Sequence, residues 1–423
     1  MSMYRYPVRY FYGSGIQSFP KQLLDDELEY FTQRCVACPL LGETGLANVF
    51  LDFNAGLRLQ IPEGQWHVTI CDHDSNLLLF DEDVSEVTLI SAEKFFVRWE
   101  IAILLDCKVV FYHCFDPESQ KIHFEFTGKA LGDNIALFPY MKSFLKKYHC
   151  EVSCTVPDYL REIVQRYYPE VEILTEPSED TYATFYLAAW VNMPFAAMED
   201  PRTIPLAKIG ESILRIPCDE KTPQYTPWKP RTIEQPYVCI AVQASMTSKA
   251  WLNPHGWDAV VNYLRGIGYR VLCIDRDVQN MSHDNVVRIP EGVENFTGNL
   301  PLAERVDLLA YADFFVGVSS GLSWLAWAVG IPVVLISGIT ARWYEFPSAY
   351  RVSNPLACHG CFNDLRVDFS KIESCACFEG TEQAFECQKK ISEMQVLDAI
   401  RDLMNERNLT VLSEQVIGGE AVK

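Results

Sequence analysis

The chain has 423 residues, of which 49% are apolar and 13% aromatic, so it can build two or three domains with cores of their own and is not wholesale disordered. Its formal net charge of −20 argues against nucleic acid as a partner, because an acidic chain repels phosphate backbones. The sequence has no run of about 18 apolar residues and no targeting segment near its start, which predicts no membrane span and a cytoplasmic protein.

The first part of the chain has the pattern of β-strands. Short alternating runs recur between residues 45 and 126, for example at 57–61 and 66–70, and Gly, Asp, Asn or Pro residues separate them. This spacing is typical of antiparallel strands. We therefore expect a small β-rich N-terminal domain over residues 1–117, which carries no visible catalytic cluster.

Strands then alternate with helices. The runs at 122–126 and 152–156 predict strands, and a helix is expected between them at about 134–148. Such alternation predicts a parallel sheet, so residues 118–235 are expected to form a first Rossmann-like domain. Residues 218–236 are rich in Pro, Thr and Lys, which predicts a linker at the end of this domain.

The alternation restarts after the linker and continues to about residue 350. Strands are expected at 237–242 and 269–274, and a helix at 256–266 between them. We therefore predict a fold of the α/β class with a second Rossmann-like domain over residues 236–350. The remaining predicted parts are a cysteine-rich metal finger at 351–392 and a C-terminal helix and tail at 393–423.

An aspartate follows the first strand of the first α/β unit. Gly132 is expected to allow a sharp turn there, which places Asp133 at the carboxyl edge of the sheet, where open α/β sheets bind ligands. A carboxylate in that position can accept a proton from an attacking hydroxyl and so act as a general base. The alternative is that Asp133 only caps the following helix.

Two loops of the second α/β unit can hold an anion. Lys249 is the only fixed cation in the polar loop 243–257 and can neutralise a diphosphate leaving group, unless it is an ordinary solvated lysine. A second loop joins a strand to a helix, where free N–H groups and the helix dipole favour an anion, unless it is an ordinary tight turn. That loop contains Ser319, Ser320, Gly321, Leu322 and Ser323.

Asp275 follows another strand of the same unit and is a candidate for contact with a nucleoside. It belongs to an Asp-x-Asp pattern that also occurs at Asp72 and Asp81. Three such matches are unsurprising in an acidic chain, so the pattern by itself does not predict a metal site.

Five of the 15 cysteines crowd into one short segment. Cys358 and Cys361 form a C-x2-C pair, and Cys375, Cys377 and Cys387 follow it. Four thiolates make a tetrahedral site suited to Zn or Fe, and a reducing compartment favours metal over disulfides. With five cysteines for four positions, either Cys375 or Cys377 is spare.

These motifs together resemble the bacterial heptosyltransferases. The Leu-Gly-Asp-x5-Pro pattern at 131–139 matches their aspartate loop, and the Ser-Gly-Leu-Ser run at 320–323 matches their nucleotide loop, with Lys249 in the place of their phosphate-binding lysine. Trp324 departs from the lipopolysaccharide enzymes, which usually carry His there. With the added cysteine finger, residues 120–405 are more similar to the autotransporter heptosyltransferases.

The resemblance implies a GT-B glycosyltransferase that moves heptose from ADP-heptose, with inversion, to serine hydroxyls of an autotransporter adhesin (the passenger protein) before export. Asp133 is the implied general base. The implied donor-binding residues are Lys249, Asp275 and the loop 319–323, and no catalytic divalent metal is expected.

The resemblance also implies one iron ion, Fe3+, per chain, with Zn as the alternative, and a homo-oligomeric ring that is a dodecamer. The spacing of family members favours Cys375 over Cys377, so that the expected ligands are Cys358, Cys361, Cys375 and Cys387. Two other functions are a glycolipid heptosyltransferase of the lipopolysaccharide type and a non-catalytic, metal-stabilised assembly protein. A measurement of nucleotide binding would distinguish the non-catalytic assembly protein from an enzyme.

Overall fold

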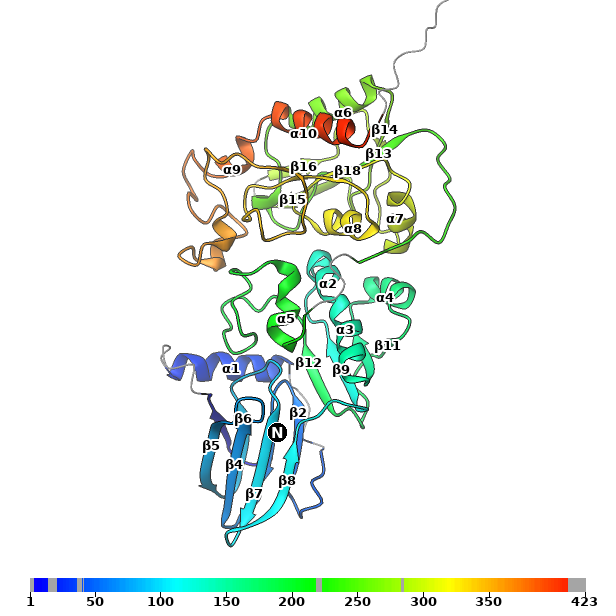
Figure 1. The fold of residues 1–423 in the computed structure, drawn as a ribbon. Helices are drawn as coiled ribbons and strands as arrows, with labels where there is room; N and C mark the ends of the chain where they lie inside the picture. Colours follow the sequence, from blue (N-terminus) through cyan, green and yellow to red (C-terminus); the bar gives the residue numbers. More distant parts are fainter. Residues whose placement is uncertain are drawn as a thin grey trace, which may run out of the picture. The chain divides into compact units, whose positions relative to one another are not determined.

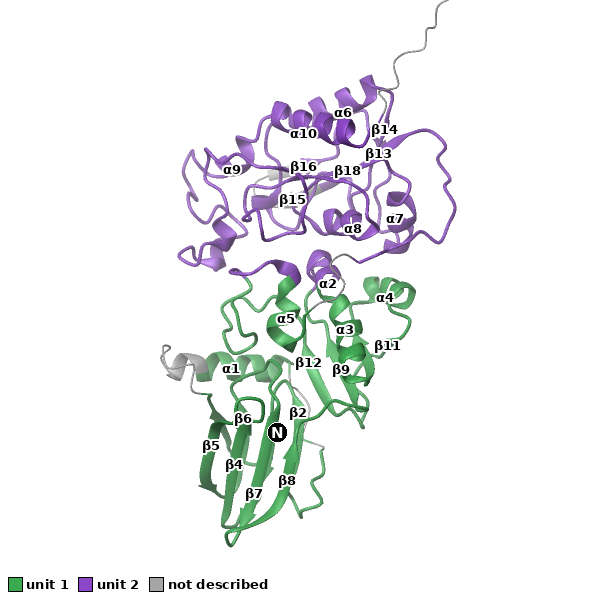
Figure 2. Cartoon of the chain, viewed as in Figure 1, with its two compact units in different colours: residues 1–128, 137–201, 208–219 green, residues 129–136, 202–207, 220–423 purple. Residues whose placement is uncertain are grey.

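The computed structural model describes residues 4–13, 21–35, 40, 42–217, 223–282 and 285–409. No helix in these ranges is long and apolar enough to cross a membrane. The chain divides into two compact units (Figure 2), of which unit 1 contains Met1–Gly128, Leu137–Pro201 and Lys208–Asp219, and unit 2 contains Lys129–Ala136, Arg202–Ala207 and Glu220–Lys423.

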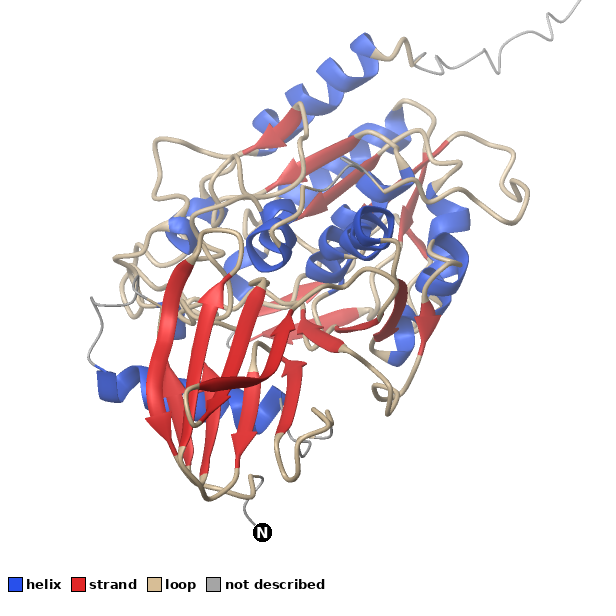
Figure 3. Cartoon of the chain, turned by 60° about the horizontal axis from the view of Figure 1, so that its bottom comes forward, coloured by secondary structure: helices blue, strands red, loops and turns tan. Residues whose placement is uncertain are grey.

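Unit 1 is built on two sheets (Figures 1 and 3). The larger sheet has eight strands in the order β1 (Val8–Phe11), β6 (Val87–Ser91), β3 (Arg58–Ile61), β2 (Phe50–Asn54), β12 (Ala183–Tyr186), β9 (Lys121–Glu125), β10 (Glu151–Thr155) and β11 (Glu172–Ile173). The smaller sheet is antiparallel, in the order β5 (Leu77–Val84), β4 (Trp66–Asp72), β7 (Trp99–Leu105) and β8 (Lys108–Cys114).

The eight-stranded sheet crosses the domain boundary expected at residue 117. Strand β2, from the β-rich part, pairs in parallel with β12, from the Rossmann-like part, with Phe53 opposite Ala183. The β-rich segment and the first α/β segment therefore share one sheet and lie in one compact unit. Local strand patterns could not show this sharing, because it depends on a pairing between segments far apart in the chain.

Among the described residues, the α-helices wholly within unit 1 are α1 (Lys21–Cys35), α3 (Pro139–Tyr148), α4 (Arg161–Tyr167) and α5 (Ile209–Leu214). The apolar face of α1 buries Leu28 and Phe31 against Phe195 and Tyr186. The Phe31 ring meets those two aromatic rings edge to face at centroid distances of 5.6 and 6.3 Å. This packing fixes α1 on the sheet.

The helix expected at about 134–148 begins earlier and is interrupted. Its first part, α2 (Leu131–Leu137), is separated from α3 by Phe138, which itself has helical φ and ψ angles of −55° and −37°. The interruption falls at Pro139, which has no N–H to continue the helical hydrogen bonds. Asp133 therefore lies in the first turn of α2 and is not its cap, so the capping alternative is wrong.

Unit 2 contains a six-stranded sheet whose pairings are all parallel. The order is β17 (Glu294–Asn295), β14 (Arg270–Cys273), β13 (Tyr237–Ala241), β18 (Phe315–Val318), β19 (Val333–Ile336) and β20 (Tyr350–Val352). A hairpin that the sequence pattern did not predict, β15 (Gln279–Ser282) and β16 (Asn285–Arg288), lies outside this sheet.

The helices that cover this sheet are α6 (Gly256–Gly266), α7 (Leu302–Leu309), α8 (Gly321–Val329) and α10 (Glu393–Glu406). Helix α10 packs on α6 and β20, and its Ile400 is fully buried in the same core as Val260 of α6. A reciprocal capping box between Ser392 and Gln395 begins α10. The predicted C-terminal tail beyond residue 409 lies outside the described residues.

The cysteine-rich segment has little regular structure. Its elements are the 3-10 turns Cys361–Asn363 and Phe369–Lys371 and the one-turn helix α9 (Glu386–Lys389). Arg202, which is buried, donates hydrogen bonds to the carbonyl oxygens of Phe362, Asp364 and Val367. Side-chain donors from outside the segment thus replace the missing regular backbone pairing.

Candidate active site and cysteine finger

The strand order of unit 2 creates a switch point between β13 and β18. From β13 the chain passes through α6 to β14 on one side, and β18 returns on the other side of β13. In open parallel sheets, ligands bind outside the carboxyl ends of the strands at such a point. The loop that carries Lys249 follows β13, and the turn that begins at Ser319 follows β18, so both predicted anion-binding segments lie at this edge.

Asp133 and Lys249 are close to each other within unit 2. Both side chains are half-buried, and they interact electrostatically without a direct ion pair in this described part of the chain. Burial raises the pKa of Asp133, and the nearby Lys249 partly offsets that rise. Burial likewise lowers the pKa of Lys249, and Asp133 partly offsets that fall. A carboxylate with a raised pKa is a better proton acceptor than an exposed aspartate.

Helices α2 and α8 meet through two glycines. A Cβ atom at Gly132 would lie 2.7 Å from Cδ1 of Trp324, and a Cβ atom at Gly321 would lie 2.5 Å from Cβ of Leu131. Gly132 is an ordinary helical residue, so the expected role in a sharp turn is wrong. Its small size is needed because the Trp324 indole packs on it, and this contact sets the position of Asp133, the next residue along α2.

The N-terminus of α8 has the features of an anion site. Ser320 precedes the helix in an extended conformation, and its buried hydroxyl has no hydrogen-bond partner among the described residues. Gly321 and Leu322 begin the helix, where N–H groups have no helical acceptor and the helix dipole is positive. Ser319 is buried beside them, whereas the Ser323 hydroxyl donates to the carbonyl of Val318 at 2.6 Å and holds the turn.

Asp275 connects two strand ends at the same edge of the sheet. Its side chain is 1% exposed, and its carboxylate accepts backbone hydrogen bonds from Val242 at 2.8 Å and Gln243 at 3.2 Å. Burial raises the pKa of Asp275 to about 6, although these hydrogen bonds oppose the rise. The carboxylate thus joins the ends of β13 and β14, and its contact with a nucleoside stays a prediction.

The five clustered cysteines line one small cavity of about 80 Å³. The thiol of Cys387 has those of Cys358, Cys361 and Cys375 as electrostatic neighbours. Burial, together with the neighbouring thiols, raises the pKa of Cys361 to about 12. This all-sulfur donor set fits a tetrahedral iron or zinc ion, which requires thiolates.

Cys375 and Cys377 differ in their surroundings. Cys375 is buried, and its sulfur accepts a hydrogen bond from the backbone N–H of Phe385 at 3.3 Å. Cys377 is exposed and contacts the thiol of Cys361. An N–H donor stabilises a thiolate ligand, so the surroundings favour Cys375 over Cys377.

Comparison with known proteins places the chain in a family. Residues 45–107 match the model of the N-terminal domain of glycosyltransferase TibC, and residues 204–357 match glycosyltransferase family 9, the heptosyltransferases. The autotransporter heptosyltransferase TibC of Escherichia coli O78:H11 is 36% identical over 383 residues, which cover 87% of this chain and 92% of TibC. The chain belongs to the autotransporter heptosyltransferase family.

The fold of this heptosyltransferase agrees with that of a solved relative. A crystal structure of TibC from enterotoxigenic E. coli H10407, described as iron-containing and dodecameric, covers 88% of this chain and 99% of its own, with a TM-score of 0.81 and 35% identity. The likeness confirms the predicted GT-B class with an additional N-terminal domain. A further relative, BimC of Burkholderia thailandensis, is 31% identical over 85% of this chain and 87% of its own and is named an inactive autotransporter heptosyltransferase.

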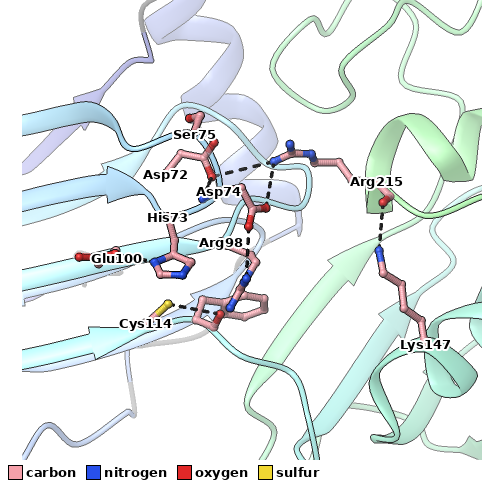
Figure 4. Close-up of polar contacts among 10 residues, drawn as sticks. Asp72, His73, Asp74, Ser75, Arg98, Glu100, Cys114, Lys147 and Arg215 are labelled. Atoms are coloured by element: carbon pink, nitrogen blue, oxygen red, sulfur yellow. Dashed lines mark hydrogen bonds and ion pairs between the residues drawn. The ribbon is translucent and has the colours of Figure 1, made fainter.

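The heptosyltransferase has a second group of potential metal ligands, which the sequence analysis did not predict. In the described part of the chain, His73, Glu100 and Cys114 have ligand atoms within 4.8 Å of one another (Figure 4). His73 Nδ1 and Glu100 Oε2 already hydrogen-bond at 2.6 Å. The positive charge of the Arg98 guanidinium opposes the rise in the pKa of Cys114 that burial causes. The same charge disfavours the binding of a cation there. We therefore interpret the His73–Glu100 pair as a surface link between the end of β4 and β7.

Proposed function

We propose that this heptosyltransferase moves a heptose from ADP-heptose to a serine hydroxyl of an autotransporter passenger protein, with inversion and before export from the cytoplasm. Membership of the family supports this, as does a crystal structure of TibC in complex with ADP-D-beta-D-heptose. The observation that carries the proposal is the closeness of Asp133 and Lys249, which interact electrostatically beside the switch point of the unit 2 sheet.

Asp133 acts as the general base in this proposal. The half-buried carboxylate removes the proton from the serine hydroxyl as the hydroxyl oxygen attacks the anomeric carbon. Lys249 favours the ionised form of the carboxylate, because its charge opposes the rise in pKa that burial causes. The packing of Trp324 on Gly132 holds the first turn of α2 in place during this step.

Lys249 and the start of α8 receive the departing ADP. The bond from the anomeric carbon to the diphosphate oxygen breaks, and the negative charge that develops there is stabilised by the lysine ammonium group. The Ser320 hydroxyl and the N–H groups of Gly321 and Leu322 bind the diphosphate oxygens. Because these groups supply the required positive charge, the proposal includes no catalytic divalent metal.

Cys358, Cys361, Cys375 and Cys387 hold one iron ion in the finger, with zinc as the alternative. Four sulfur ligands leave no open position for a substrate, so the metal stabilises the poorly structured segment 351–392. The iron-containing, dodecameric TibC supports both this metal and a ring of twelve chains for the present protein.

The experiment that tests this function measures ADP release by the purified protein supplied with ADP-heptose. Release should require a serine-bearing passenger fragment and should stop when its serines are replaced by alanine. Release with a lipopolysaccharide core acceptor alone would instead support the glycolipid alternative. A chain that binds ADP but releases none with either acceptor would resemble the inactive relative BimC, and the proposed function would be wrong.

A further inference from the structure

The loop that carries Lys249 is held by the cysteine-rich segment. Ser248, the residue before Lys249, is 4% exposed, and its hydroxyl donates to the carbonyl of Ile372 at 2.8 Å. The carbonyl of Ser248 accepts a hydrogen bond of 2.6 Å from Nε2 of Gln388. The hydroxyl and the carbonyl of this serine are thus both bonded to the cysteine-rich segment.

Two more side chains of the same loop bond to that segment. Trp251 Nε1 donates to the carbonyl of Ile391 at 2.9 Å, and Asn253 Nδ2 donates to the same carbonyl at 3.2 Å. Ser248 also lines the cavity that the five cysteines share. The loop is therefore bonded to the finger segment at three positions between Ser248 and Asn253, and not at a single residue.

Gln388 is the finger residue that bonds to the peptide group between Ser248 and Lys249. It follows Cys387 directly, is fully buried, and its Oε1 has no hydrogen-bond partner among the described residues. The amide nitrogen of Gln388, and not its oxygen, must face Ser248, because a carbonyl oxygen can only accept a hydrogen bond. The side chain thus contributes one buried hydrogen bond, and that bond goes to the Lys249 loop.

The Ser248–Lys249 peptide is a rigid plane that includes the Cα atom of Lys249. Gln388 donates a hydrogen bond to the oxygen of this peptide, which is the carbonyl of Ser248. The N–H of the same peptide, which belongs to Lys249, donates to the carbonyl of Met246 at 3.1 Å. The plane is therefore fixed on both sides, which sets the direction in which the lysine side chain leaves the backbone. Losing the Gln388 bond frees one side of the plane and leaves a buried carbonyl unpaired.

We propose that Gln388 is a positioning residue for the donor site, which acts by holding Lys249 through the carbonyl of Ser248. The proposal rests on the proposed role of Lys249 in binding the diphosphate. It assigns the finger a second task besides its own folding, since the residue beside Cys387 fixes the donor-binding loop.

The test is a double-mutant cycle on ADP affinity, measured by calorimetry on the full chain. Gln388→Met keeps the length of the side chain but cannot donate, and we expect about tenfold weaker ADP binding. Lys249→Ala should also weaken ADP binding, and adding Gln388→Met to Lys249→Ala should cause almost no further loss. Gln388→Asn, whose shorter side chain does not bring its amide to the Ser248 carbonyl, should give a comparable loss and serves if the methionine variant does not fold.

Asn354→Leu is the matched control. Like Gln388, Asn354 donates a hydrogen bond from its side-chain amide to a backbone carbonyl, that of Lys390 in the finger segment, at 2.7 Å. Its replacement should leave the affinity for ADP unchanged. Fully additive losses in the cycle, or no loss in either Gln388 variant while Lys249→Ala binds weakly, would overturn the positioning role. Unchanged ADP affinity in Lys249→Ala would instead refute the proposed donor site itself.

Discussion

Replacing Gly132 by alanine tests whether the contact between α2 and α8 positions Asp133. The added Cβ atom would lie 2.7 Å from Trp324 Cδ1 and 3.1 Å from its Cγ, so the indole or the helix must shift. Overpacking of this kind costs about 1–3 kcal/mol. The gain in helix propensity from glycine to alanine returns about 1 kcal/mol. We therefore expect the variant to be about 0–2 kcal/mol less stable than the native chain.

The control is Gly266→Ala in α6, where the added Cβ atom meets nothing within 4 Å. This variant should be as stable as the native chain or slightly more stable. Calorimetric unfolding of both variants isolates the clash, and heptose transfer by Gly132→Ala should fall about 10- to 100-fold because its base is displaced. Equal stability and equal activity of the two variants would refute a positioning contact between Trp324 and Gly132.

Four further outcomes concern Asp133, Lys249 and the cysteine finger. Asp133→Asn should lower the transfer rate by about 10²–10⁴ while ADP binding and folding persist, and near-normal transfer would rule out its role as base. Lys249→Ala should weaken both ADP binding and turnover, whereas unchanged affinity would place Lys249 outside the site. Because burial raises the pKa of Asp133 above 3.8, kcat/KM should fall with decreasing pH through that raised pKa, and the fall should move to higher pH in Lys249→Ala, which removes the opposing charge. Elemental analysis of serine variants should show metal loss for Cys358, Cys361, Cys375 and Cys387 but not for Cys377, and the reverse result for Cys375 and Cys377 would change the ligand set.

The sequence was informative for candidate site residues that lie in loops directly after a strand. Lys249 was a candidate as the only fixed cation of a loop after a strand, and the turn 319–323 as a connection from a strand to a helix. The structure places both loops at the carboxyl edge of the sheet, at the switch point. Asp133 was also a candidate from its place after β9, and the structure brings it next to Lys249. These predictions needed only local patterns and the order of the elements.

Other features depended on contacts between distant segments. Gly132 has no unusual backbone conformation, and its small size makes sense only once Trp324 is seen to pack on it. The pairing of β2 with β12 joins two segments that local patterns separate into domains. Arg202 and Gln388 belong to no motif, yet they hold the finger and the lysine loop through backbone carbonyls. A hydrogen bond to a main-chain oxygen places no demand on the partner's side chain, so it leaves no pattern in the partner's sequence.

The most direct test of the account is the intact mass of an autotransporter passenger protein that is co-expressed with this chain. The native chain should add whole heptose units to the passenger, and the modified positions should be serines. The Asp133→Asn variant, produced at the same level and with the same ADP affinity, should leave the passenger mass unchanged. An unmodified passenger beside the native chain, or equal modification by the Asp133→Asn variant, would contradict the proposed transferase mechanism.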